Sequence, residues 1–286
     1  DISTFGGFDN IKIFAQNCNI VSKNLEVYDF EDLDIKNKKL LIVAPHPDDA
    51  EISSFGLYSS AKESFIVTVT AGECSCKYCD IEDDKEVQAK LKGNLRVFNA
   101  LTTGLLGNVE YQNSIALGYF NETIRNMYEN KEKVFSSKTA GVSDINYFRR
   151  VQHSKIKTNP NPTAKWDSLL SDFKYIINST KADLILTLHP QIDSNPDHQY
   201  ITLALLEAME ELNYEDIKLL TFTNHLSQNE YFPYGEIFST SPLAPKFDEP
   251  FIFDKIYSHQ LSKEKQIYKY YALESMHDLR DSTIQI

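Results

Sequence analysis

The sequence has little of what marks fibrous, disordered, disulfide-bonded or membrane-spanning proteins. Glycine and proline number 10 each among 286 residues, which excludes collagen-like and low-complexity chains. The four cysteines are too few for a secreted disulfide scaffold. No apolar run approaches the roughly 18 residues that a membrane-spanning helix needs, so we expect no integral membrane segment in this chain.

Positive charge is also scarce. The chain has 29 lysines and arginines against 41 aspartates and glutamates, and its formal net charge is -12. Such an acidic chain is a poor electrostatic match for nucleic acid or an anionic membrane surface, so we expect no nucleic-acid partner. The first residues do not combine a charged start with an apolar segment, as a secretory signal would. We therefore expect a cytoplasmic protein of bacterial type.

What the sequence does contain is an alternation of short apolar runs and amphipathic segments. The apolar runs predict buried strands over residues 39–44, 65–70, 183–188 and 217–222. Amphipathic spacing predicts helices over residues 85–101, 166–177 and 199–212. In the first helix, the residues expected to face the core are Val87, Leu91, Leu95, Phe98 and Leu101. The alternation predicts an α/β fold with a mostly parallel sheet and helices on both faces.

Two regions stand apart from this alternation. Residues 1–38 have a mixed pattern and are expected to form an N-terminal extension or linker, followed by one domain over residues 39–286. Within that domain, residues of about 104–165 are rich in Tyr, Asn and Ser and are expected to form an elaborated insertion over the sheet edge. Such a segment either shapes a substrate pocket or is a surface excursion.

The sharpest local signal is the segment Ala-Pro-His-Pro-Asp-Asp-Ala-Glu over residues 44–51, directly after the first predicted strand. His46 and Asp49 lie three residues apart in a proline-stiffened turn. This spacing lets an imidazole and a carboxylate converge on one point, while Asp48 between them points elsewhere. Taken alone, the segment also fits an ordinary turn in which an Asp side chain caps the backbone.

A second polar segment, residues 189–198, follows the third predicted strand and begins a helix with Asp197 and His198. Taken alone, Asp197 also fits the N-cap of that helix. Ligands bind where the carboxyl ends of parallel strands meet, so the two segments together indicate one site. Two histidines and one carboxylate form a recognised catalytic set for a divalent metal, and a further carboxylate is the usual general base.

These motifs resemble those of the PIG-L/LmbE-like zinc-dependent N-deacetylases, which act on N-acetylglucosamine conjugates. The family's Ala-His-Pro-Asp-Asp-Glu corresponds to Pro-His-Pro-Asp-Asp-Ala over residues 45–50, and its His-Pro-Asp-His to Asn-Pro-Asp-His over residues 195–198. The resemblance extends more loosely over residues of about 38–275. Its other matching features are Val-Thr-Ala-Gly-Glu at 69–73, Arg96 and a helix over residues 261–274.

The resemblance implies a Rossmann-like fold of the LmbE type, with one Zn²⁺ held by His46, Asp49 and His198. It also implies that Asp48 is the general base. The implied reaction removes the acetyl group from an N-acetylated amino sugar or its conjugate, in glycan or glycoconjugate biosynthesis. A site of two histidines and one aspartate also accepts iron, cobalt or nickel.

The sequence departs from the family pattern at two positions. Ala50 stands where the family has Glu, and Glu51 follows it. More important, Asn195 stands at the place of a His that the resemblance implies polarises the carbonyl or acts as an acid. Asn donates hydrogen bonds but does not deliver a proton. Asp197 remains as a helix cap or as a partner that orients a ligand, and His225 is either the missing donor or a capping or surface histidine.

Three further groups are candidates for substrate binding. Arg149 and Arg150, with His153, either grip a phosphate or carboxylate of the substrate or are ordinary surface charge. His189 either adds an imidazole to the pocket or is structural. The aromatic segment over residues 229–235 either stacks on sugar rings or packs against the protein.

The cysteines are unevenly placed, because Cys74, Cys76 and Cys79 crowd together while Cys18 is distant in sequence. With Cys18, the three could make a structural zinc site, although such sites usually use two separated pairs of ligands. Free thiols and a disulfide are the alternatives.

The sequence as a whole predicts a metal-dependent amidohydrolase. One rival keeps the metal but acts as a hydratase or lyase that adds water to an unsaturated acid. The other is a non-catalytic sugar-binding domain, suggested only by Asn195. The intact set of His46, Asp48, Asp49 and His198 favours the enzyme.

Overall fold

The computed structural model describes residues 12–22, 33–74, 84–214, 217–226 and 255–277. The chain divides into two compact units, Asp1–Asp32 with Phe253–Ser258, and Leu33–Ile252 with His259–Ile286. All strands and α-helices described below belong to the second unit. Leu33 and Ile35 are buried in it, so the main unit begins several residues before the expected boundary at residue 39.

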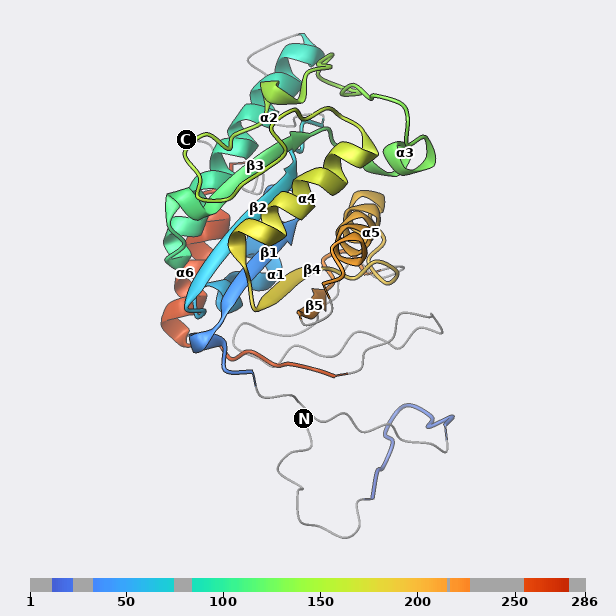
Figure 1. Cartoon of the computed structure of the whole chain (residues 1–286). Helices are drawn as coiled ribbons and strands as arrows, with labels where there is room; N and C mark the ends of the chain where they lie inside the picture. Colours follow the sequence, from blue (N-terminus) through green and yellow to red (C-terminus); the bar gives the residue numbers. More distant parts are fainter. Residues whose placement is uncertain (1–11, 23–32, 75–83, 215–216, 227–254, 278–286) are drawn as a thin grey trace. The chain divides into compact units, whose positions relative to one another are not determined.

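The core of the second unit is a parallel sheet of five strands in the order β3-β2-β1-β4-β5 (Figure 1). Almost every residue of β1 to β4 is buried, because helices cover both faces, and the strand sequences are therefore continuous apolar runs. The strands are β1 (Lys39–Ala44), β2 (Glu63–Thr70), β3 (Ser114–Tyr119), β4 (Leu184–Leu188) and β5 (Lys218–Phe222). The predicted α/β fold with a parallel sheet is confirmed.

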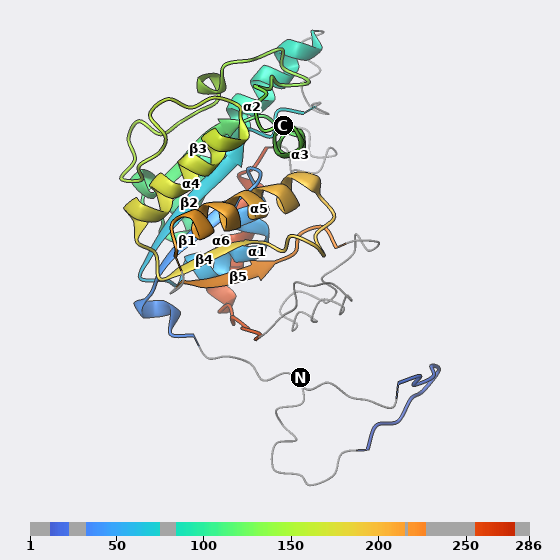
Figure 2. The ribbon, with the colours of Figure 1, turned by 45° about the vertical axis from the view of Figure 1, so that its right-hand side comes forward.

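Helices α1, α2 and α6 cover one face of the sheet, and α4 and α5 cover the other (Figures 1 and 2). Side chains cap three of them, since Asp84, Asn195 and Ser262 accept hydrogen bonds from the first turns of α2, α5 and α6. The helices are α1 (Asp49–Tyr58), α2 (Lys85–Thr102), α3 (Ile124–Glu129), α4 (Trp166–Thr180), α5 (Pro196–Glu211) and α6 (Lys263–Glu274). Within the described ranges, no helix is long and apolar enough to cross a bilayer.

The segment expected as an insertion contributes a strand to the sheet. Ser114–Tyr119 forms β3 at the edge, pairing parallel to β2 with Ser114 opposite Ile66. Gly118 within it has a φ of +79°, beside a register shift in the pairing with β2. These features hide it in the sequence, so the expectation that all of residues 104–165 lie over the sheet was wrong for this part.

Helix α2 buries a different face from the one expected. Leu91, Leu95 and Phe98 are 47%, 37% and 58% exposed, although their spacing predicted a core stripe. The buried face needs small residues, because a Cβ on Gly93 would lie 2.5 Å from the Phe148 ring. The residues of α2 that are buried are Ala89, Gly93, Arg96, Val97, Asn99, Ala100 and Leu101.

Arg149 belongs to the core and not, as expected, to a substrate site. Its guanidinium lies 2.6 and 3.1 Å from the two carboxylate oxygens of Asp172 on α4, and it donates to the Leu117 carbonyl at 2.9 Å. Both side chains are buried, and Tyr119 also donates to Asp172 at 2.9 Å. The pair therefore ties the segment after β3 to α4. Arg150, in contrast, donates to the neutral Asn94 side chain and to two carbonyls.

Replacing these neighbouring arginines should lower stability by very different amounts. Arg149→Ala leaves the Asp172 carboxylate buried without its charge partner, so we expect a loss of about 3–5 kcal/mol in the free energy of unfolding. Arg150→Ala removes hydrogen bonds to neutral groups only and should cost about 1 kcal/mol. Urea unfolding of the two variants and the wild type measures both values. Equal losses in the two variants would contradict the buried pair as a source of stability.

Candidate metal centre

The site lies where the order of strands reverses. β1 pairs with β4 at the middle of the sheet, while the chain leaves β1 toward β2 on one side and leaves β4 toward β5 on the other. In such sheets the crevice between the carboxyl ends of these two strands is the usual ligand site. The turn from β1 to α1 and the first turn of α5 meet at this crevice, as the sequence predicted.

The turn after β1 is held in shape by a hydrogen bond within it and by two more from Thr70 at the end of β2. The His46 amide donates to Asp49 Oδ2 at 2.8 Å, and the Thr70 amide and hydroxyl both donate to the Pro45 carbonyl at 2.9 Å. Asp48 has a φ of 131°, a conformation that costs a non-glycine residue about 1–3 kcal/mol. Strained backbone of this kind is concentrated at functional sites.

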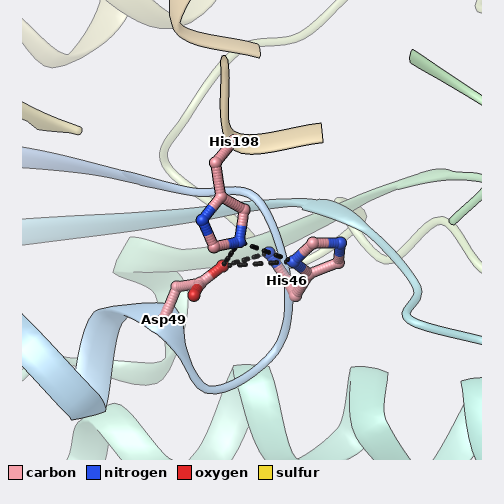
Figure 3. Close-up of side chains that lie close together, drawn as sticks. All are labelled: His46, Asp49 and His198. Carbon is pink, nitrogen blue, oxygen red and sulfur yellow. Dashed lines mark hydrogen bonds and ion pairs between the residues drawn. The ribbon is translucent and has the colours of Figure 1, made fainter. Parts of the chain in front are cut away.

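His46, Asp49 and His198 converge on one point (Figure 3). His46 Nδ1 lies 3.0 Å from His198 Nε2 and 3.3 Å from Asp49 Oδ2. His198 Nε2 and Asp49 Oδ2 are 3.2 Å apart. Three ligands at the zinc distances of about 2.0–2.1 Å in a tetrahedron are separated by about 3.3–3.4 Å. The triangle therefore fits one face of such a site, and its donors suit zinc or a related transition metal.

Each of the three side chains is held by a second partner on the side away from the triangle. Asp197 Oδ2 lies 3.3 Å from His46 Nε2, and Asp193 Oδ1 lies 3.0 Å from His198 Nδ1. Asn224 Nδ2 donates to Asp49 Oδ1 at 2.6 Å. Such outer partners set the tautomer and orientation of metal ligands. The sequence missed Asp193 and Asn224, because no motif signals a contact between the loops after β4 and β5.

The start of α5 shows what replaced the family's histidine. Asn195 is the N-cap, and its Oδ1 accepts from the Asp197 amide at 2.9 Å. Asn195, and not Asp197, therefore caps the N-terminus of α5. Asp197 is buried beside His46, and its Oδ2 also accepts from the Glu122 amide at 2.7 Å. Its contact with the ring of His46 is the one that the other expectation, orientation of a ligand, requires.

Arg96 reaches from α2 to the turn that carries the ligands. Its Nη2 lies 2.6 Å from Asp48 Oδ2 and donates to the Pro47 carbonyl at 2.5 Å. Gly72 makes room for it, since a Cβ there would lie 2.6 Å from Arg96 Nη1. Arg96 therefore both neutralises Asp48 and holds it in its strained conformation.

The other histidines differ in how close they lie to the triangle. The ring centroid of His225 is 5.4 Å from that of His198, and His225 itself is exposed. His189 is buried, and its Nδ1 accepts from the amides of Gln191 and Ile192, which is the structural alternative for this residue.

Arg150 and His153 line a small cavity of about 170 Å³ together with Ser114, the first residue of β3. That cavity is at the beginning of the strand, whereas the triangle lies beyond the ends of β1 and β4. The structure therefore does not bring these two residues to the triangle.

The cysteine cluster is described only in part. Cys18 and Cys74 are free thiols, and Lys92 Nζ lies 3.3 Å from Cys74 Sγ. Cys76 and Cys79 lie outside the described residues, as does the aromatic segment over residues 229–235.

The carboxylates around the triangle change the pKa of both histidines. Burial lowers the pKa of His46, but Asp197 and Asp49 outweigh it and raise the pKa to about 9. Burial likewise lowers the pKa of His198, but Asp49 and Asp193 raise it to about 10. For Asp49, burial raises the pKa, yet the two imidazoles hold it well below its usual range. Without a metal, the surrounding carboxylates therefore favour the protonated form of these imidazoles.

This protonation predicts that metal binding releases protons. Histidine binds a metal only after losing the proton on the ligand nitrogen, so Zn²⁺ should displace about one to two protons per ion at pH 7. The affinity should rise as the pH rises toward the two pKa values. Calorimetric titration in buffers of different ionisation enthalpy counts these protons. Binding with no proton release would show that the ion is held elsewhere.

Comparison with known proteins agrees with the site. The sequence model of the PIG-L family, described as GlcNAc-PI de-N-acetylase, matches residues 41–209. No curated protein matches the chain significantly. Among solved structures, GalB, the 4-carboxy-2-hydroxymuconate hydratase from Pseudomonas putida KT2440, is similar at 15% identity and a TM-score of 0.36. That match covers 60% of this chain and 56% of GalB, so the chain spans little more than half the length of that protein.

The family match includes both segments that supply the triangle, since His46, Asp49 and His198 all lie within residues 41–209. It also covers more than half of the 286 residues. The resemblance noted in the sequence is thereby confirmed, and the chain belongs to the PIG-L family.

Proposed function

We propose that the protein is a zinc-dependent hydrolase that removes the acetyl group from an N-acetylated amino sugar or its conjugate. The observation that carries the proposal is the triangle of His46 Nδ1, Asp49 Oδ2 and His198 Nε2, with the carboxylate of Asp48 next to it in the chain. Three protein ligands leave positions for water and substrate, as in catalytic zinc sites. The description of the family as a de-N-acetylase supports this choice of reaction.

When bound, a divalent ion at such a site lowers the pKa of water and polarises a carbonyl group. In the proposed reaction, Asp48 accepts the proton of the water that attacks the acetamido carbon. Arg96 Nη2 holds Oδ2 of Asp48 at 2.6 Å and so fixes the orientation of this carboxylate. The carbon–nitrogen bond then breaks, and Asp48 returns the proton to the leaving amine. The products are acetate and the free amino sugar.

Asn195 does not deliver this proton, since it has no acidic hydrogen and its Oδ1 accepts from the Asp197 amide. We assign proton return to Asp48 for that reason, with His225 as the second candidate. The ring of His225 lies next to that of His198, and the Asp193 carboxylate accepts from its backbone amide at 3.2 Å. Exposure leaves the imidazole of His225 accessible to a substrate.

The proposal predicts acetate release that depends on Asp48. The substrates are N-acetylated sugars in free, nucleotide-linked, lipid-linked and oligomeric forms, tested with the zinc-loaded protein. Asp48→Asn keeps an oxygen for Arg96 but removes the base, so we expect a loss of at least about 100-fold in rate with zinc still bound. Asp167→Asn, on the exposed first turn of α4, is the matched control and should retain full activity.

Three results would contradict the proposal. Full acetate release by Asp48→Asn would exclude Asp48 as the base. A zinc-loaded wild type that releases no acetate from any member of the panel, but hydrates unsaturated carboxylic acids, would establish the hydratase in its place. A protein that binds sugar without turnover would establish the binding domain.

A further inference from the structure

The metal centre includes a residue from beyond the part of the chain that matches the family. Asn224 follows β5 in the segment Thr223–Leu226, whereas the family match ends at residue 209. The structure nevertheless places its side chain against Asp49, one of the three residues of the triangle. A residue in this position can change how the site holds an ion without being a ligand itself.

The orientation of the Asn224 amide is fixed from both sides. Nδ2 donates to Asp49 Oδ1 at 2.6 Å, and Ser53 Oγ on α1 donates to Asn224 Oδ1. The amide nitrogen therefore faces the carboxylate. Because Asp49 Oδ1 is taken by Asn224, Asp49 presents its other oxygen, Oδ2, to the two imidazoles at 3.3 and 3.2 Å.

Asp193 holds the segment that carries Asn224. It is fully buried, and its Oδ2 accepts from the backbone amides of Asn224 and His225 at 2.9 and 3.2 Å. Its Oδ1 lies 3.0 Å from His198 Nδ1 and accepts from the Asn195 amide at 3.1 Å. A further backbone hydrogen bond joins Ser194 to His225 at 2.7 Å. One carboxylate thus fixes the loop after β5 and a metal ligand together.

We infer that Asn224 is a positioning residue of the metal centre, and that its amide makes Asp49 bind the ion through Oδ2 alone. Asp193 in turn sets both the position of Asn224 and the tautomer of His198. The amide fixes the rotation of the Asp49 carboxylate and blocks its second oxygen from the ion. Nδ1–H of His198 donates to Asp193, which leaves Nε2 as the ligand atom. The inference rests on the metal site of the proposed function, but not on the substrate or the reaction.

The test is the affinity of the purified full chain for Zn²⁺, measured by competition with a chromophoric chelator. Loss of an outer partner typically weakens metal binding about 10–100-fold, and we expect this loss for Asn224→Ala. Asn94→Ala is the matched control, because Asn94 on α2 is also a half-buried asparagine, but its side chain contacts Arg150. Its affinity should equal that of the wild type.

Substitution with Co²⁺ separates positioning from a general loss of structure. The wild type should show the intense visible absorption of a four-coordinate ion. In Asn224→Ala, the freed Asp49 carboxylate should turn and bind through both oxygens, so the absorption should weaken. Ser53→Ala, which removes only the partner of Asn224 Oδ1, should shift affinity in the same direction by a smaller amount.

A folded Asn224→Ala protein with wild-type Zn²⁺ affinity and an unchanged Co²⁺ spectrum would overturn the inference. If Asn224→Ala does not fold, unchanged affinity in Ser53→Ala would overturn it instead. The outcome is independent of acetate release. A wild type that binds zinc tightly but releases no acetate removes the proposed function, while the comparison of zinc affinities still decides the role of Asn224.

Discussion

The parallel pairing of β1 with β4 is the constraint on which the site depends. It brings together two chain segments about 150 residues apart, the turn after β1 and the first turn of α5. Each segment alone supplies too little for a metal site, since one carries His46 and Asp49 and the other His198. Backbone hydrogen bonds of the sheet fix the spacing of the two strands. The three side chains of the triangle therefore meet at the carboxyl ends of these strands.

Charge balance explains why so many acidic groups are tolerated at one buried point. Asp49, Asp193 and Asp197 surround two imidazoles, and all five side chains are buried. In the metal-free protein, these carboxylates favour positive charge on the imidazoles, so they raise the pKa values of His46 and His198. A divalent ion supplies a similar positive charge. Arg96 offsets the charge of Asp48 separately.

The sequence identified the residues of the triangle because their information is local. His46 and Asp49 lie in one turn and His198 opens one helix, so motif and strand order together were sufficient. The outer partners were not predictable in this way, since Asp193 and Asn224 meet only because β4 and β5 are neighbours. The sequence places neither residue in a recognisable motif, and the family match does not extend to Asn224.

The errors in the fold have a related cause. Amphipathic spacing identified α2 but not which face is buried, because the sheet edge and Phe148 select the small residues of the opposite stripe. The strand β3 was hidden by Gly118, which has a left-handed backbone within it. Arg149 has the same charge as a substrate-binding arginine, and only the position of Asp172 on α4 shows that it belongs to the core.

The central claim is that the triangle holds a divalent metal. X-ray absorption at the zinc edge, on protein loaded with one equivalent of Zn²⁺, tests it directly. An ion held by the triangle should show a shell of nitrogen and oxygen atoms only, at about 2.0–2.1 Å, with the multiple-scattering features of two imidazoles. Sulfur neighbours at about 2.3 Å would contradict it, because they would place the ion on cysteine thiolates and leave the triangle without its metal.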